Sequence, residues 1–304
     1  SQGYLRLLIL LKMKNNFLNK LNNRKFNGTF RKLDVFENGI DFFSNDYLGF
    51  ANKSSSIDMS GATGSRLLSG NSNNAAVAEK KIAKFYSSES SLIYTSGYTL
   101  NVGLISCLAS RHDLILYDEN VHASIRDGIR LSQAQSFSFK HNNISDLERQ
   151  LISNTKSNVF VLIESLYSMT GKFSDLISIC ELCEKYNAYL IVDEAHSIGA
   201  FGDNGKGLCY KYNIHNRVFA RVVTFGKAYG LMGAAVLSSE VMIDYLINFS
   251  RSFIYTTAMP PSIYKKIEMN VCDSKINELI DRLQLNLKYF RDHFNHDSII
   301  SELN

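Results

Sequence analysis

The feature that most constrains the fold is a series of short, wholly apolar runs that begins near residue 90. The runs cover residues 92–94, 114–117, 159–163, 189–192, 222–225 and 234–237. Between them, segments such as 144–152 and 174–187 carry apolar residues at the three- and four-residue spacing of a helix. Continuous apolar strands that alternate with helices are typical of a mostly parallel sheet covered on both faces. The sequence therefore predicts an α/β fold.

Length and composition narrow the class of protein further. The chain has 304 residues, of which 45% are apolar and 20% charged, which excludes a disordered protein and suggests about two domains. Lys and Arg number 33 against 29 Asp and Glu, with no run of like charge, so nucleic acid is not expected as a partner. Five cysteines are few for this length, and an odd number cannot all pair, so a disulfide framework is not expected. The apolar run 7–11 is too short to span a membrane, so we expect a cytoplasmic protein.

Three segments divide the chain. Residues 1–45 are expected to form a helix and a small hairpin, whose turn is marked by Asn38-Gly39. Met13 resembles a natural start, which leaves open that residues 1–12 are a non-native extension. Residues 46–260 are expected to form the sheet domain. Both prolines of the chain stand at 260 and 261 and interrupt regular structure there. Residues 261–304, which carry a long helical pattern, are therefore expected to begin a second, small domain.

Polar clusters follow four of the predicted strands, at residues 95–99, 164–168, 193–196 and 226–230. The carboxyl ends of parallel strands meet at one edge of a sheet, where ligands bind. Pyridoxal phosphate needs a lysine for its Schiff base, a carboxylate beside its ring nitrogen and a helix N-terminus for its phosphate. Lys227, Asp193 and the string Ser96-Gly97-Tyr98 supply these groups in turn. Their order and placement predict a pyridoxal phosphate site.

Each of these residues has a commoner explanation when taken alone. A lysine between glycines is usually a solvated turn, and an aspartate that ends a strand is often a helix cap. The string Asp193-Glu194-Ala195-His196 also matches the magnesium box of P-loop helicases, but the required phosphate loop, Gly-x-x-x-x-Gly-Lys-Ser/Thr, is absent from the sequence. The helicase interpretation is therefore rejected.

The remaining cysteines and histidines predict no metal site. Cys180 and Cys183 lie in one amphipathic helix without a second Cys/His pair at zinc spacing, so we expect them to be core residues. Five histidines stand in polar surroundings and are expected at the surface: His112, His141, His215, His293 and His296.

Seven motifs resemble a known family. They lie at residues 44–49, 64–70, 96–98, 121–124, 192–197, 224–227 and 254–261. Together they resemble the α-oxoamine synthases, a branch of the fold-type I pyridoxal-phosphate enzymes, over residues 45–261. The resemblance implies the large domain of that fold and a homodimer with shared active sites. The motifs at 224–227, 233–236 and 254–257 are most similar to members of biotin synthesis that condense L-alanine with a pimeloyl thioester and release CO2.

The resemblance also implies a role for each site residue. Lys227 forms the Schiff base and removes the α-proton of alanine, and Asp193 pairs with the pyridine nitrogen. His122 stacks on the ring, and His196 binds the phenolic oxygen. The other residues implied are Ser96, Gly97, Tyr98 and Thr224 around the phosphate and ring, Ser168 beside the cofactor, Thr257 reaching the phosphate from the partner subunit, and Asn45 and Arg31 near the substrate.

Two departures from the family keep alternatives open. The family usually carries a histidine shortly after Ser69-Gly70, whereas Asn71-Ser72 follows here. The family's small C-terminal domain, with an arginine for the substrate carboxylate, is expected to be largely missing, because the sequence ends at Asn304. Turnover by this chain therefore stays open. The alternatives are an acyltransferase that uses glycine, and a non-catalytic subunit that binds the cofactor; the acyl donor, CoA or carrier protein, is also open.

Overall fold

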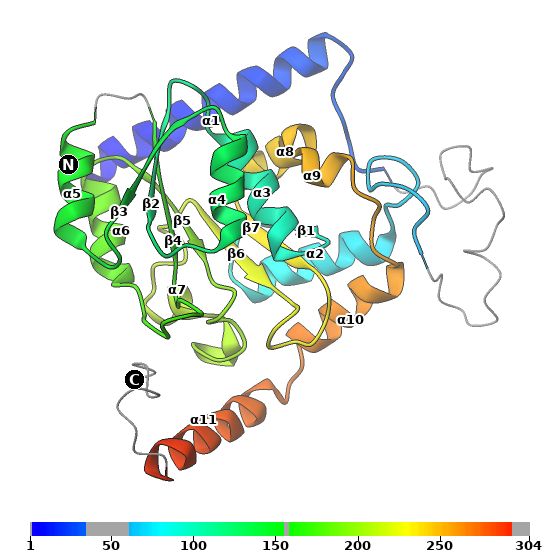
Figure 1. The fold of residues 1–304 in the computed structure, drawn as a ribbon. Coiled ribbons are helices and arrows are strands. Elements are labelled where there is room, and N and C mark those ends of the chain that lie inside the picture. Colours follow the sequence, from blue (N-terminus) through cyan, green and yellow to red (C-terminus); the bar gives the residue numbers. More distant parts are fainter. Residues whose placement is uncertain (1, 35–60, 155–157, 294–304) are drawn as a thin grey trace.

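The computed structural model describes residues 2–34, 61–154 and 158–293, with side chains from residue 14 onward (Figure 1). The predicted hairpin around Asn38-Gly39 and the predicted substrate residue Asn45 lie outside the described residues. The first described element is the helix α1 (Gln2–Phe26).

Seven strands form one sheet, and all but one of them run in the same direction. The strands are β1 (Ser90–Tyr94), β2 (Leu114–Asp118), β3 (Gln135–Phe139), β4 (Val159–Glu164), β5 (Tyr189–Asp193), β6 (Ala220–Thr224) and β7 (Ala234–Ser238). Their order across the sheet is β1-β7-β6-β5-β4-β2-β3. β7 pairs antiparallel with both β1 and β6, and the other pairs are parallel. The predicted α/β class with a mostly parallel sheet is confirmed.

The burial of each strand explains whether an apolar run in the sequence predicts it. Every residue of β4, β5, β6 and β7 is buried, as expected for strands covered on both faces. β3 is an edge strand in which four of five residues are partly or fully exposed, so it has no apolar run and was missed. The direction of β7 was not visible either, because burial is the same for both orientations.

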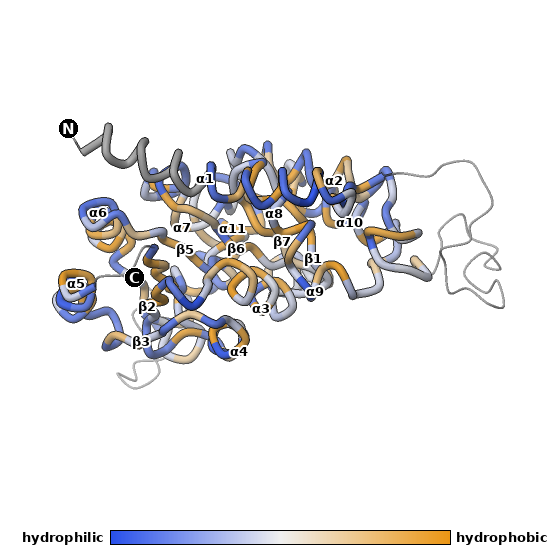
Figure 2. Tube along the Cα trace, turned by 90° about the horizontal axis from the view of Figure 1, so that it is seen from above, coloured by the Kyte–Doolittle hydropathy of each residue, from blue (hydrophilic) through white to orange (hydrophobic). Residues whose placement is uncertain are grey.

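Helices cover both faces of the sheet. The described helices after α1 are α2 (Asn73–Phe85), α3 (Gly97–Leu108), α4 (Ala123–Leu131), α5 (Ile144–Ile152), α6 (Leu176–Lys185), α7 (Leu208–Lys211), α8 (Glu240–Phe249), α9 (Arg251–Ile254), α10 (Pro261–Val271), α11 (Ile276–His293) and the 3-10 turn η2 (Asp203–Gly205). Side chains of α3, α4 and α8 share one apolar cluster with one face of the sheet. Those of α2, α5, α6 and α10 fill two clusters on the opposite face. In Figure 2 these helices carry mixed blue and orange, as expected for amphipathic helices around a buried sheet.

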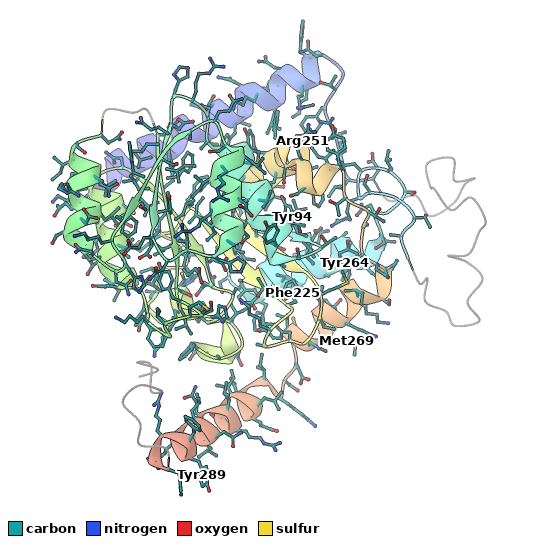
Figure 3. All side chains as sticks on the ribbon, in the orientation of Figure 1. Tyr94, Phe225, Arg251, Tyr264, Met269 and Tyr289 are labelled. Carbon is teal, nitrogen blue, oxygen red and sulfur yellow. The ribbon has the colours of Figure 1, made fainter. Side chains whose placement is uncertain are left out.

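The helical expectations agree with the described elements. The patterns at 144–152 and 174–187 correspond to α5 and α6, and each helix begins after a side-chain cap, Asn143 and Asp175 respectively. Pro261 occupies the first turn of α10, where a missing N–H costs nothing. α11 extends away from the sheet domain, with Tyr289 at its outer side, whereas Tyr94 and Phe225 lie near the centre of the molecule (Figures 1 and 3). None of the described helices combines the length and the apolar character needed to cross a membrane.

Candidate active site

The carboxyl ends of β1, β2, β4, β5 and β6 lie at one edge of the sheet, as the sequence predicts. Three of these strands end in a buried carboxylate: Asp118, Glu164 and Asp193. Tyr94 ends β1 and Thr224 ends β6. Because isolated buried charges are costly, such a row of acids at strand ends requires cationic or hydrogen-bonding partners at the same edge.

Lys227 and His196 form the central contact of this edge. Lys227 lies in an exposed turn after β6, and its Nζ shares a hydrogen bond of 2.7 Å with His196 Nε2. Partial burial of the amino group lowers the Lys227 pKa, while the charges of Asp193 and Glu164 act to raise it. Burial, and then the charge of Lys227, lower the His196 pKa, which favours the neutral imidazole. Two of the predicted residues are thus in direct contact.

Each carboxylate oxygen of Asp193 accepts one hydrogen bond. Its Oδ1 accepts from the Ala195 N–H at 2.9 Å, and its Oδ2 accepts from Asn101 Nδ2 at 2.8 Å. The residue is only 6% exposed. A carboxylate held in this way has a single orientation and keeps lone pairs for one further donor.

His122 lies at the start of α4, where it caps the helix. Its Nδ1 accepts from the Ser124 N–H at 3.2 Å and lies 2.8 Å from the Ser124 hydroxyl. A ring nitrogen that accepts carries no hydrogen, which places the ring proton on Nε2. The His122 N–H donates to Glu164 Oε1 at 2.6 Å, so β4 and α4 are joined directly behind the ring.

The start of α3 lies against the end of β6. Ser96 caps the helix reciprocally with Thr99, which uses the N–H groups of these two residues. The N–H groups of Gly97 and Tyr98 belong to the same first turn and point out of the helix end. A Cβ on Gly97 would lie 2.7 Å from Thr224 Cγ2, so only glycine allows this approach. Thr224 Oγ1 is buried and has no hydrogen-bond partner within the described part of the chain.

Glu164 is a site residue that the sequence interpretation missed. It is 5% exposed, and burial together with the neighbouring Asp193 raises its pKa to about 8, against the opposing effects of the His122 N–H and Lys227. The available signal was its position: it is the one charged residue of an otherwise apolar strand and stands where ligands bind.

No hydrogen bond among the described residues joins the Lys227–His196 pair to Ser168, Arg31 or Thr257, or to Ser96, Gly97, Tyr98 and Thr224. Ser168 is exposed in the loop after β4, and Asn45 is not described. Arg31 and Thr257 lie together instead, in a hollow of about 510 Å³ that Ser65 and Tyr255 also line. Arg31 binds Asn248 there through its backbone N–H and its guanidinium, at 3.0 and 3.2 Å.

The surface assignment of the histidines is wrong for His141 and His215. His141 is mostly buried, with Nδ1 3.0 Å from Asp118 Oδ1 and its ring edge-on to Tyr167. His215 is partly buried against the Tyr210 ring. Both follow short polar loops whose sequence gives no sign that they fold back onto the sheet. His112 and His293 are exposed as predicted, and His296 lies outside the described residues.

The other sequence features have structural roles. Cys180 and Cys183 are buried in the core cluster of α6, which confirms their assignment. Asn71, at the departure from the family pattern, accepts from Arg66 Nε at 2.8 Å and donates to the Asp34 carbonyl. Within the part of the chain that the structure describes, no group of three or more His, Cys, Asp or Glu side chains could hold a metal ion.

The fold and the site define a class of protein. The family model for aminotransferase class I and II matches residues 37–302, and the chain belongs to this family. The open α/β sheet, with a lysine after β6 and an aspartate at the end of β5, agrees with that assignment.

Individual relatives narrow the class. A Methanocaldococcus jannaschii protein provisionally named 8-amino-7-oxononanoate synthase is 36% identical over 292 residues, which cover 92% of this chain and 78% of that protein. The 8-amino-7-oxononanoate synthase of Chlorobaculum parvum is 38% identical over 239 residues, or 73% and 61% of the two chains. Among solved structures, Sphingomonas wittichii serine palmitoyltransferase matches with a TM-score of 0.74 and 31% identity, over 77% of this chain and 59% of that one.

These relatives place the chain among the α-oxoamine synthases, which confirms the resemblance read from the motifs. The chain spans about three fifths of the length of the Chlorobaculum parvum and Sphingomonas wittichii proteins.

Proposed function

We propose that this chain binds pyridoxal phosphate at Lys227 and belongs to a cytoplasmic, homodimeric acyltransferase that condenses L-alanine with a pimeloyl thioester, giving 8-amino-7-oxononanoate. The observation that carries the proposal is the contact of 2.7 Å between Lys227 Nζ and His196 Nε2, beside the buried Asp193. The names of the relatives support the choice of substrates.

The described residues fit the cofactor. The first turn of α3 offers the N–H groups of Gly97 and Tyr98 to a phosphate, and Thr224 Oγ1 beside it is a buried hydroxyl without a partner in the described structure. Asp193 keeps a free lone pair for a protonated ring nitrogen. The Nε2–H of His122 and the His196 ring complete a polar, aromatic lining from α4 and the end of β5.

The chemistry follows from these placements. When bound, pyridoxal phosphate supplies an electron sink for charge that forms at the α-carbon of the amino acid. Lys227 Nζ would hold the cofactor and would accept the α-proton of the amino acid; burial lowers its pKa, which increases the neutral fraction able to do so. Asp193 would pair with the protonated ring nitrogen, and His196 would hold Nζ or the phenolic oxygen by a hydrogen bond.

A homodimer gives Arg31 and Thr257 a role. Both line an exposed hollow without any described contact to Lys227 of the same chain. In the proposed dimer Thr257 reaches the phosphate of the partner's site, and Arg31, Asn45 and Ser168 lie near the bound substrate or cofactor.

The proposal is tested by trapping the cofactor. The chain is mixed with pyridoxal phosphate, reduced with borohydride, digested and analysed by mass spectrometry. We expect the reduced cofactor on Lys227, no trapping in Lys227→Ala, and unchanged trapping in Lys172→Ala, which removes an exposed lysine of the loop after β4. Trapping spread evenly over surface lysines would refute the site.

Substrate choice is tested on the same reconstituted protein. L-alanine is expected to change the visible absorption band and, with pimeloyl-CoA or the pimeloyl carrier protein, to release CO2. A response to glycine alone would support a glycine-using acyltransferase. A visible absorption band that changes with neither amino acid would support a non-catalytic cofactor-binding subunit.

A further inference from the structure

Asn101 connects two residues of the site that come from different elements. It lies in α3 and is 3% exposed. Its Nδ2 donates to Asp193 Oδ2, at the end of β5, at 2.8 Å and to the Ser124 Oγ of α4 at 3.0 Å. An amide nitrogen carries two hydrogens, so both are used. Because an ionised carboxylate only accepts, the NH2 group and not the carbonyl must face Asp193.

The second bond continues to His122. Ser124 is fully buried, and its hydroxyl oxygen accepts from Asn101 while lying 2.8 Å from His122 Nδ1. A hydroxyl that accepts from the amide is free to donate its own hydrogen to the ring nitrogen. The direction of both bonds therefore agrees with a ring that accepts at Nδ1 and carries its proton on Nε2.

We propose that Asn101 is a positioning residue, which fixes the orientation of the Asp193 carboxylate and, through Ser124, the tautomer of the His122 ring. The effect of the Asp193 orientation on the cofactor rests on the proposed function. The effect on the His122 tautomer does not, because it involves only side chains of this chain. In a buried network each member depends on the direction of the others, so one donor in the middle controls both ends.

Two substitutions separate this role from packing. Asn101→Asp keeps the shape of the side chain but replaces the donor with an acceptor that repels Asp193, whereas Asn101→Ala removes the side chain. A packing role predicts that Asp is tolerated better than Ala, and the proposed role predicts the reverse. The matched control is Asn158→Ala, which removes an Asn–Asp bond of 2.6 Å to Asp113 at the opposite edge of the sheet.

The first measurement needs no cofactor. Imidazole nitrogen NMR of the histidine-labelled chain, with His122→Gln used to assign the signal, reports which ring nitrogen carries the proton. We expect the Nε2–H form in the wild type and in the Asn158→Ala control. In Asn101→Ala and in Ser124→Ala the Ser124 N–H still donates to Nδ1 at 3.2 Å, but the directed hydroxyl bond of 2.8 Å is lost, so we expect a larger share of the Nδ1–H form. An unchanged His122 signal in both Asn101 variants would overturn the link through Ser124.

The second measurement uses the chain reconstituted with pyridoxal phosphate. Loss of a hydrogen bond to a charged group is expected to raise the cofactor dissociation constant about tenfold in Asn101→Ala, and further in Asn101→Asp. The visible circular dichroism of the cofactor should fall in both, because ring orientation is lost. Equal effects in the Asn158→Ala control, or Asp tolerated better than Ala, would overturn the proposal.

The two proposals fail in different ways. If the wild type does not bind the cofactor at Lys227, the proposed function fails, and the NMR measurement still decides whether Asn101 orients His122. If Asn101→Ala does not fold, Ser124→Ala tests the same link, and it should alter the His122 signal while changing cofactor affinity less than Asn101→Asp does.

Discussion

Glu164→Gln should make the free energy of unfolding less sensitive to pH. The carboxyl group is buried at the end of β4, and its pKa is raised to about 8 from the ordinary value of 4.5. In the unfolded chain the group ionises near its ordinary value. Between these two pKa values the folded state holds a proton that the unfolded state has lost, so stability falls as pH rises and changes little from this group above pH 8.

The structure sets the size of the effect. At 1.36 kcal/mol for each pH unit, the whole interval corresponds to about 5 kcal/mol, and the part between about pH 6 and about pH 7.5 to about 2 kcal/mol. Glutamine keeps an oxygen that accepts the His122 N–H, now made to Glu164 Oε1 at 2.6 Å, but it does not titrate. The variant should therefore gain stability relative to the wild type as pH rises.

Urea unfolding of both proteins without cofactor, at several pH values across this range, measures the difference directly. We expect the free-energy difference between variant and wild type to grow by about 2 kcal/mol between about pH 6 and about pH 7.5. A difference that stays constant with pH would show that Glu164 is already ionised in the folded protein. The reasoning about the row of carboxylates at the sheet edge would then be wrong.

Three further predictions concern single contacts. Gly97→Ala should destabilise the fold by about 1–3 kcal/mol in urea unfolding, because its Cβ would lie 2.7 Å from Thr224 Cγ2, and Thr224→Ser in the same chain should restore part of the loss. Glu194→Ala should cost about 3–5 kcal/mol by the same assay, since it leaves the buried Arg221 guanidinium, now 2.6 Å from the carboxylate, without its partner. With a thiol reagent under native conditions, Cys272 should react first, because it is the exposed cysteine and the buried ones become accessible only on unfolding.

Controls make each of these three results decisive. Thr224→Ser alone should lower the free energy of unfolding only slightly. If the double variant does not regain stability relative to Gly97→Ala, the clash is not with the threonine methyl group. Loss of the exposed pair between Lys185 and Glu148 should cost less than about 1 kcal/mol, and an equal loss there would contradict the argument from burial. Fast labelling of Cys183 in the native protein would show that α6 is not packed as described.

The strands could be predicted where burial on both faces makes the sequence a continuous apolar run. β4 and β5 are apolar up to their last residue because both faces are covered, and their runs predict strands. β3 was missed because it lies at the sheet edge, where Phe137 is half exposed and polar residues are tolerated. The reversed direction of β7 is set by its pairing with β1 and β6, and a local sequence pattern does not encode such pairing.

The site was predictable to the extent that it follows strand ends. Lys227 and Asp193 were predicted in this way and His196 from the family resemblance, and Lys227 and His196 are in contact. Glu164 falls in the predicted polar cluster at 164–168, but no motif gave it a role, because its raised pKa depends on burial beside Asp193. Asn101 could not be predicted, because its contact with Asp193 joins α3 to the end of β5, two segments far apart in the sequence.

The place of β7 has a consequence for how the chain assembles during synthesis. In the described sheet β1 has one neighbour, β7, and reaches β6 only across it. A ribosome releases β1 early and β7 late, so β1 and the helix start that follows it must wait, unpaired, until most of the sheet has already formed. We therefore expect the start of α3, where the proposed phosphate site lies, to join the sheet only after β7 has been made.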